Sequence, residues 1–313
     1  MFEITRYTAD RKTAWDNFVA RSKQGTFLFC RDYMDYHSDR FHDHSLMVWN
    51  DNALVAVLPA NQEADVLWSH QGLTYGGLLT LDKTKTAEVC DIFRHINHYL
   101  RAQGFHRVLY KPVPWIYHRL PAEEDLYAVF NVCRARLTVR SIASVIRSSN
   151  SLKWSRIRSW GADKAHTHGI EVEQRDADYA PFWKVLTENL KTTHYVAPVH
   201  TLEEMQRLHA AFPDNIQLYT ARLGSEVLGG VLLYVTPRVV HAQYISASPE
   251  GKRKHALDAI FRTILTQDYR HCPYFDFGTS NEQRGQVLNE GLVYQKEGFG
   301  GRGVCYDWYE WEL

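Results

Sequence analysis

The stretch of residues 228–303 constrains the fold of this chain more than any other part of its sequence. Two strand-like apolar runs, residues 228–235 and 239–247, lead through a polar turn at residues 248–254 into a helical pattern. Apolar side chains at helical spacing give that helix one apolar face, which consists of Leu257, Ile260, Phe261, Ile264 and Leu265. A third strand at residues 274–278, a helical segment near 289–296 and a terminal strand complete an α/β (α+β) order of elements.

Length and composition predict two domains with sizeable cores. The chain has 313 residues, of which 45% are hydrophobic, and an ordinary domain holds roughly 100–200 residues. Its 36 basic residues balance its 36 acidic residues, so the net charge does not steer the protein toward nucleic acid. The apolar runs are too short to cross a bilayer, and residues 1–21 are too polar for a signal peptide. We therefore expect a cytoplasmic protein without a membrane span.

The cysteines and histidines predict neither a disulfide framework nor a metal site. The cysteines are odd in number, widely scattered and never in a Cys-x-x-Cys pair, which is typical of reduced thiols; they are Cys30, Cys90, Cys133, Cys272 and Cys305. The chain has 16 histidines, but their neighbouring pairs lack the cysteines or the His-Glu-x-x-His spacing of zinc sites. We therefore expect no metal.

The first half of the sequence repeats the order of elements of the second half. It contains a strand at residues 54–57, a polar His-Gln step at 70–71, a helix at 86–104 and a strand at 107–110. These parts correspond to residues 228–233, 241–243, 254–270 and 274–277, at offsets of roughly 165 to 175 residues, about the length of one domain. We therefore predict two copies of one α/β unit, residues 1–148 and residues 149–313, with a basic connecting helix at 150–167.

Three motifs in this order resemble the GNAT acyltransferase superfamily, and more closely its Fem-type (FemAB-like) branch. They are Tyr294-Gln-Lys-Glu-Gly-Phe299, similar to the superfamily's closing Tyr-x-Lys-x-Gly-Phe; Leu73-Thr-Tyr-Gly-Gly-Leu78, similar to a Fem-type Pro-x-Tyr-Gly-Gly step; and the basic helix ahead of Gly169-Ile-Glu-Val172. The resemblance implies two tandem GNAT-like domains, each a mixed twisted sheet flanked by helices. It also implies an N-acyltransferase that moves an acyl or aminoacyl group from acyl-CoA, as co-substrate, or from aminoacyl-tRNA to an amine, with a small molecule or cell-envelope precursor as acceptor.

The donor site of such folds is a gap between two neighbouring strands, in which an extended donor tail bonds to the backbone as an added strand would. We expect this gap near residue 247, with a loop and a helix N-terminus directing N–H groups at a pyrophosphate. The expected donor contacts are Ser246, Ala247, Ser248, Gly251, Lys252, Arg253 and Lys254. The superfamily's loop, Gln/Arg-x-x-Gly-x-Gly/Ala, has more glycines than this one, so both donor classes remain open.

Acyl transfer to an amine requires a general base, a stabilised oxyanion and an acid for the leaving group. The resemblance assigns the acid to Tyr294, four residues before Gly298, and a phenol with a pKa of ~10 suits that step. The base remains open among four residues in or beside strand ends, namely His241, Asp276, Glu282 and Glu297. Asp276 alternates with Phe275 and Phe277 and therefore points away from the side that those rings occupy. A structural or surface role is the alternative for each candidate.

The acceptor is expected to contact polar and aromatic residues of both halves, namely His70, Tyr75, His194, His200 and Tyr244. The basic connecting helix could hold a phosphorylated acceptor or tRNA, and an ordinary solvated helix is the alternative. The competing functional hypothesis is a non-catalytic ligand-binding protein with a degenerate GNAT-like fold, which the reduced phosphate loop favours. The sequence leaves the oligomeric state open.

Overall fold

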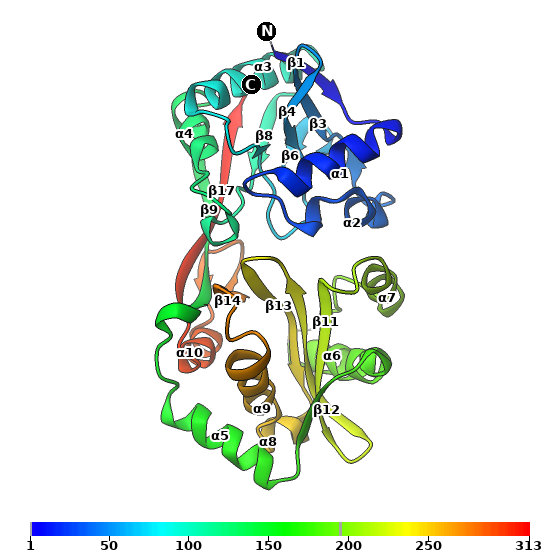
Figure 1. Cartoon of the computed structure of the whole chain (residues 1–313), viewed down its shortest axis with the longest axis vertical. Coiled ribbons are helices and arrows are strands. Elements are labelled where there is room, and N and C mark those ends of the chain that lie inside the picture. The colour runs from blue at the N-terminus through cyan, green and yellow to red at the C-terminus, as the bar shows by residue number, and fades with distance from the viewer. Residues whose placement is uncertain (1, 194–195) are drawn as a thin grey trace. The chain divides into compact units, whose positions relative to one another are not determined.

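The computed structural model describes residues 2–193 and 196–313, and its internal contacts divide the chain into two compact units (Figure 1). Unit 1 consists of Met1–Ser141, Asn281–Val287 and Cys305–Leu313, and unit 2 consists of Ile142–Ser280 and Leu288–Val304. The sequence analysis assigned all of residues 149–313 to the second domain. The difference arises because the last strand, β17 (Arg302–Glu312), pairs with β8 (Arg107–Tyr110), which lies in unit 1.

Unit 1 is a mixed β-structure flanked by helices. One sheet is antiparallel in the order β1 (Phe2–Arg6), β3 (Leu46–Asn50), β4 (Ala53–Leu58) and β7 (Leu79–Thr80). The end of β17 lies beside β8, followed by β6 (Val66–Trp68), β5 (Asn61–Glu63) and β2 (His42–Asp43), and only β6 and β8 are parallel among these described pairs. The helices are α1 (Lys12–Arg21), α2 (Arg31–Met34), α3 (Thr86–Ala102) and α4 (Glu124–Asn131).

Helix α3 forms where the sequence predicts a helix, because its apolar residues recur on one face. Val89, Ile92, Phe93 and Ile96 are buried in the core of unit 1, together with residues of β3, β4 and β8. Between β3 and β4, Asp51 has a φ of 53°, a left-handed conformation that aspartate tolerates in tight turns. The apolar face of α3 and the turn between β3 and β4 therefore follow from local sequence patterns.

Unit 2 is a second mixed sheet. Its order is β10 (Glu171–Gln174), β11 (Ile216–Leu223), β12 (Glu226–Val235), β13 (Val239–Ala247), β14 (Tyr274–Thr279) and the second half of β9 (Arg136–Arg147). The pairs are antiparallel except for β13 and β14, which are parallel. Among the described pairs, each unit thus contains one parallel pair of strands, β6–β8 or β13–β14, within a mixed sheet flanked by helices, as predicted, and unit 1 has an antiparallel sheet in addition.

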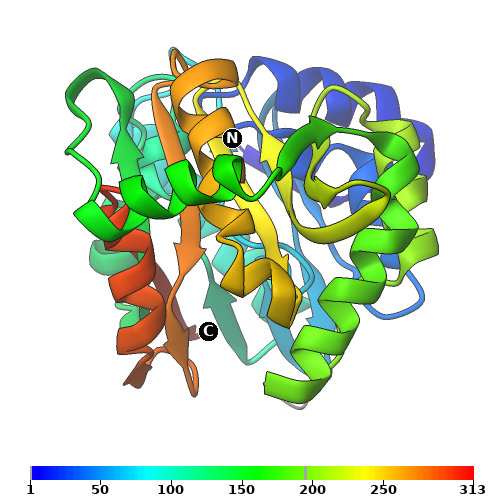
Figure 2. The same ribbon diagram turned by 90° about the horizontal axis from the view of Figure 1, so that it is seen from below.

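The helices of unit 2 cover both faces of its sheet. They are α5 (Arg156–Thr167), α6 (Tyr179–Thr193), α7 (Leu202–Ala211), α8 (Pro249–Arg253), α9 (Ala256–Thr263) and α10 (Glu290–Gly298). Figure 2 looks at unit 2 from below and shows α5 lying across α9. On α9, Ile260 and Phe261 enter the core of unit 2. Gly230 on β12 leaves room for the ring of Phe182 on α6, because a Cβ there would clash with that ring.

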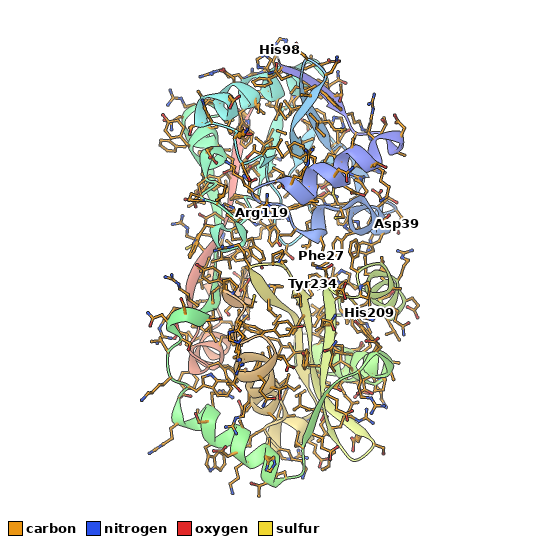
Figure 3. The ribbon with its side chains drawn as sticks, viewed as in Figure 1. Phe27, Asp39, His98, Arg119, His209 and Tyr234 are labelled. Carbon is orange, nitrogen blue, oxygen red and sulfur yellow. The ribbon has the colours of Figure 1, made fainter. Side chains whose placement is uncertain are left out.

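His209 on α7 contacts neighbouring segments of the same chain (Figure 3). Its Nδ1 lies 2.8 Å from the carbonyl oxygen of Ile216, at the start of β11, and its Nε2 lies 3.3 Å from a carboxylate oxygen of Asp176. The ring also packs against Tyr179 of α6, with 5.1 Å between the ring centroids. His209 is therefore a structural residue.

The turn expected at residues 248–254 is largely helical. Ser248 is the N-cap of α8, because its Oγ accepts a hydrogen bond from the N–H of Gly251 at 3.0 Å, and Pro249 occupies the first helical position. His255 then adopts a left-handed φ of 61° before α9 begins. The predicted helix over 254–270 is thus shorter, and it ends in a π-helical turn, Ile264–Asp268.

Three general properties complete the fold. All five cysteines carry free thiols, of which Cys90 and Cys133 are buried, Cys30 and Cys272 are partly buried, and Cys305 is exposed. Within the described ranges, no helix combines the length and apolar character needed to span a bilayer. Among the same residues, histidine, cysteine and carboxylate side chains do not gather into a group of three or more that could hold a metal ion.

Candidate functional site

The parallel strands β13 and β14 separate after a short paired segment. Their register joins Val239 to Tyr274, Val240 to Phe275, and His241 to Asp276, and within the described chain it goes no further. Strand β13 continues to Ala247 and stays paired with β12 on its other side. The edge of β13 over residues 242–247 is therefore not paired with β14, which is the separation that the sequence analysis expected near Ala247.

Ser246 lies on this separated part of β13. Its side chain is 2% exposed, and its Oγ has no hydrogen-bond partner among the residues that the structure describes. Most buried polar side chains are hydrogen-bonded, so an unsatisfied hydroxyl calls for a physical explanation. Contacts within the described chain do not supply one.

His241 and Asp276 form a buried pair where the two strands part. Nδ1 of His241 lies 2.9 Å from Oδ2 of Asp276, and the N–H of Gly278 donates to Oδ1 of the same carboxylate at 2.7 Å. A carboxylate can only accept, so the neutral tautomer that donates to it carries its proton on Nδ1 and has a lone pair on Nε2. The side chain of His241 is 10% exposed, and its ring lies against Gly278, whose φ of 74° favours glycine. The structure thus combines two separately predicted bases into one oriented unit.

Lys296 fixes the end of β14 beside this pair. Its Nζ donates to the carbonyl oxygens of Gly278 and Thr279 at 2.9 and 2.8 Å. Burial lowers its pKa to about 8, and the negative charge of Asp276 opposes that shift. Sequence reasoning missed Lys296, although it is the lysine of the Tyr-x-Lys-x-Gly-Phe motif.

Tyr294 and the remaining base candidates lie at the surface. Tyr294, on α10, is 67% exposed, and Glu297 on the same helix is exposed as well. Glu282 is exposed in the short pair β15 (Asn281–Glu282) and β16 (Val287–Leu288), and contacts assign it to unit 1. The structure therefore does not bring Glu282 into the same unit as His241 and Asp276.

The predicted phosphate loop uses most of its backbone donors internally. The N–H of Gly251 binds the Ser248 side chain, and the N–H of Lys252 binds the Ser248 carbonyl at 2.9 Å. A Cβ at residue 251 would clash with the carbonyl of Leu228, so packing alone explains this glycine. The basic side chains are the other groups that could bind a phosphate here. Lys252 donates to Asn189 at 2.6 Å, Lys254 lies 3.9 Å from Glu250, and Arg253 is exposed.

Two of the predicted acceptor residues meet in unit 2. Nδ1 of His200 lies 2.7 Å from the hydroxyl of Tyr244, whose ring packs edge-on against Trp183 of α6. Burial raises the pKa of Tyr244 to about 12, so this phenol keeps its proton and serves as a hydrogen-bonding group. His194 lies outside the described residues.

His70 and Tyr75 are buried in unit 1, where the chain after β6 folds over the end of β8. The N–H of Gly76 donates to the carbonyl of Lys111 at 2.9 Å, and the Lys111 Nζ donates to the carbonyl of Leu73 at 2.6 Å. Burial holds the pKa of His70 well below its usual value, and the Tyr75 hydroxyl bonds to Thr26 at 3.2 Å. The parallel pair of unit 1 is therefore closed by its own chain, in contrast to β13–β14.

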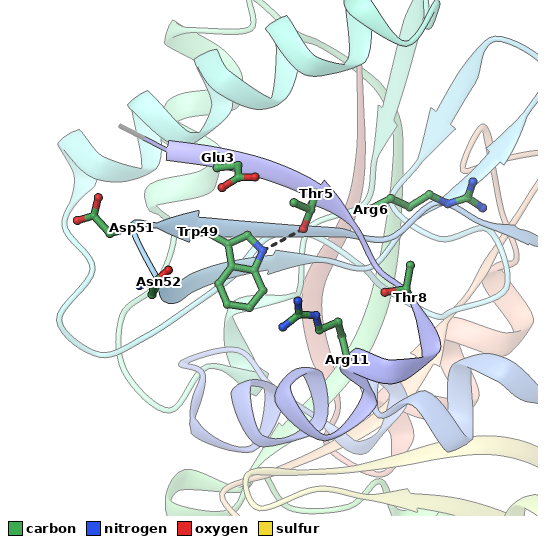
Figure 4. Close-up of a pocket in the computed structure, with 8 residues that line it drawn as sticks. All are labelled: Glu3, Thr5, Arg6, Thr8, Arg11, Trp49, Asp51 and Asn52. Carbon is green, nitrogen blue, oxygen red and sulfur yellow. Dashed lines mark hydrogen bonds between the residues drawn. The ribbon is translucent and has the colours of Figure 1, made fainter.

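Unit 1 carries a separate polar hollow of about 470 Å³ beside β1 and β3 (Figure 4). The indole N–H of Trp49 donates to Thr5 at 2.9 Å, and the guanidinium of Arg11 lies 5.6 Å from the Trp49 ring. Its charges are mixed, since Glu3 and Asp51 line it together with arginines. This balance gives the hollow no preference for an anionic donor.

Comparison with known proteins agrees with this geometry. Residues 155–284 match the family model described as an acetyltransferase (GNAT) domain, and no curated protein matches. Among solved structures, FemX shares 11% identity at a TM-score of 0.69, covering 99% of this chain and 97% of that one. The L-PGS from Bacillus licheniformis shares 10% at 0.64, covering 97% and 92%.

A tandem GNAT protein from the clavulanic acid biosynthesis pathway shares 10% identity at a TM-score of 0.52, covering 100% of this chain and 98% of that one. At such identities these likenesses concern the fold. The acetyltransferase description comes from the family match at residues 155–284, and the full-length neighbours show the fold. Residues 155–284 thus match a GNAT acetyltransferase domain, and the whole chain has the tandem GNAT fold of these solved structures.

Proposed function

We propose that unit 2 transfers an acyl or aminoacyl group from a donor lying between β13 and β14 to an amine. The observation that carries this proposal is the early end of the β13–β14 register at His241 and Asp276. The edge beyond that point offers backbone groups to an extended donor, and the unsatisfied hydroxyl of Ser246 lies on it. The closed β6–β8 pair of unit 1 offers no such edge within the described chain.

In this mechanism His241 is the general base. Its Nε2 takes a proton from the acceptor amine while Asp276 holds Nδ1 and stabilises the imidazolium. The amine nitrogen attacks the donor carbonyl carbon, a C–N bond forms, and the C–S bond of a thioester or the C–O bond of an ester breaks. Backbone N–H groups on the separated edge of β13 stabilise the oxyanion. The leaving sulfur or oxygen then takes a proton, with Tyr294 as the candidate acid.

Replacing Tyr294 with phenylalanine tests the acid. We expect kcat to fall about tenfold with a thioester donor and further with an ester donor, because an alkoxide needs protonation more than a thiolate does. The melting temperature should change little, since the ring is mostly exposed. The measurement is kcat with both donor types. Equal turnover by the variant and the native protein would remove Tyr294 from the mechanism.

The donor can be either acyl-CoA or aminoacyl-tRNA, and α8 bears on this choice. Acyl-CoA suits the GNAT fold. Because the backbone amides at the start of α8 are bonded within the chain, side chains, chiefly Lys252 and Arg253, would have to bind the pyrophosphate. We therefore expect acetyl-CoA to raise the melting temperature. At a concentration of 100 times Kd, its binding should add about 2.7 kcal/mol to the free energy of unfolding. A Lys252→Ala, Arg253→Ala double variant should lose most of that shift and keep the shift from S-acetylpantetheine. The exposed Lys184→Ala on α6 is the matched control.

The same titration separates the two hypotheses of function. The bonded amides of α8 and the exposure of Tyr294 are the features that favour a non-catalytic binding protein. Such a protein would respond to a UDP-linked peptidoglycan precursor and to neither donor analogue. A shift from acetyl-CoA or S-acetylpantetheine that accompanies product formation supports the transferase.

The acceptor that we propose is an amine on a cell-envelope precursor, which the protein would bind in the cytoplasm. One structural neighbour is named as a putative lysylphosphatidylglycerol synthetase, a name that describes an aminoacylated lipid, which supports a cell-envelope acceptor and leaves the choice of an amine to the family match. His200 and Tyr244 are the polar pair of unit 2 available for orienting it.

A further inference from the structure

Unit 2 contains a second concave site near the paired end of β13 and β14. It has a volume of about 400 Å³, within the range of small-molecule pockets, and Phe275 of β14 and Ile146 of β9 form part of its wall. Phe275 precedes Asp276, the last residue of β14 that pairs with β13. The pocket therefore adjoins the closed part of this strand pair, whereas the donor gap begins beyond it.

Four aromatic residues line this pocket: Trp154 and Tyr269 are partly exposed, and Phe275 and Phe299 lie behind them in the core. The segment before α5 passes α10 (Figure 1), where the N–H of Ser155 donates to the Gly298 carbonyl at 2.8 Å. This contact holds Trp154 edge-on to Phe299, with 5.0 Å between centroids and 84° between the rings. Tyr269 directly follows the π-helical turn Ile264–Asp268, an irregularity that is frequent at functional sites.

The charges at this pocket have one sign. Lys153 and Arg270 line it, both exposed, and the set of described lining residues contains no carboxylate. Nε of Arg270 bonds to His271 at 2.9 Å, and in the described chain neither cation forms an ion pair. Elsewhere in unit 2, the hollow beside α5 and α9 differs, because its Arg262 is paired with Asp163 at 2.7 Å. Two cations without counterions above an aromatic pocket favour a ligand that is both apolar and anionic.

We propose that this pocket binds an anionic amphiphile. Its apolar body lies against the partly exposed rings of Trp154 and Tyr269, and its carboxylate or phosphate head lies between Lys153 and Arg270. The rim agrees with this chemistry, since Leu152 is an exposed apolar side chain beside Lys153. The proposal does not depend on acyl transfer, because none of the proposed catalytic residues lines the pocket.

The test is calorimetric titration of the full chain with decanoate and decyl phosphate. The two ligands share a chain and differ in the head group, so they separate carboxylate from phosphate as the preferred anion. Decanol and decyltrimethylammonium have the same chain without the negative charge. We expect at least one of the anions to bind, and decanol to bind about tenfold more weakly or worse. The cationic ligand should not bind.

Two variants assign the binding to this pocket. Lys153→Glu with Arg270→Glu should weaken binding of the preferred anion about tenfold or more, and Ser151→Trp should weaken all ligands by filling the space. Lys184→Glu, the same charge change on α6, is the matched control, and unchanged melting temperatures verify folding. Equal affinity of decanol and decanoate would overturn the proposal, as would anion affinity that both pocket variants leave intact. Binding to phosphatidylglycerol vesicles alone, without binding of the monomeric ligands, would also overturn it in favour of a membrane-surface contact.

Discussion

Replacing His241 with glutamine is expected to lower kcat by about 10²- to 10⁴-fold, the usual contribution of a positioned general base. Glutamine retains a donor that can reach the Asp276 carboxylate, so the pair that fixes the strand junction is kept while the basic nitrogen is removed. The measurement is kcat with the donor that the thermal-shift titration identifies. The melting temperature reports on the fold.

Asp276→Asn provides an independent form of this test. Asparagine can accept from the N–H of Gly278 with its oxygen and donate to Nδ1 of His241 with its nitrogen. The imidazole then carries its proton on Nε2 and cannot act as a base, so turnover should fall by a similar factor without loss of the hydrogen bonds. His209→Gln on α7 is the matched control, because that ring bonds within a structural contact (Figure 3). Full turnover by His241→Gln at an unchanged melting temperature would exclude His241 as the base.

The elements of this fold were predictable where local patterns decide the structure. The apolar stripe of α3 and the Asn50–Asn52 turn act over a few residues, so the sequence predicts them directly. The course of the last strand was not predictable in this way. Strand β17 pairs with β8, some two hundred positions earlier, and no local pattern specifies such a partner.

In the candidate site, too, the sequence predicts single residues but not their distant partners. His241 and Asp276 were each predicted as bases, but their pairing depends on the register of two parallel strands, which the sequence does not specify. Lys296 was missed, because the sequence does not show which side of α10 faces the sheet, and residues two apart on a helix point in nearly opposite directions. An exposed Tyr294 therefore implies that Lys296 faces the interior of unit 2. The sequence also does not show that Ser248 caps α8 and binds the N–H of Gly251, because the same residues are equally compatible with an open loop.

Lys111 is expected to give unit 1 a stability that rises with pH. Its side chain is 5% exposed, its Nζ bonds to the Leu73 carbonyl at 2.6 Å, and burial lowers its pKa to about 7. In the unfolded chain the pKa of a lysine is about 10.4. Between these values the unfolded state binds one more proton than the folded state, so the free energy of unfolding increases with pH by about 1.4 kcal/mol per unit. Below pH 7 both states are protonated and the slope from this residue vanishes.

Comparison with Lys111→Met isolates this contribution, because methionine has a similar length and no charge. Urea unfolding of both proteins at several values between pH 8 and 9.5 should give a slope that is smaller in the variant by about 1.4 kcal/mol per pH unit. Other titrating groups, including Lys296 with its pKa of about 8, are common to both proteins and cancel in this difference. The loss of the bond to Leu73 lowers the stability of the variant at every pH and leaves the slope unaffected. Lys83→Met, at an exposed position of unit 1, should keep the native slope. Equal slopes in the native protein and Lys111→Met would mean that Lys111 keeps its charge in the folded state, bound to the chain that closes the β6–β8 pair.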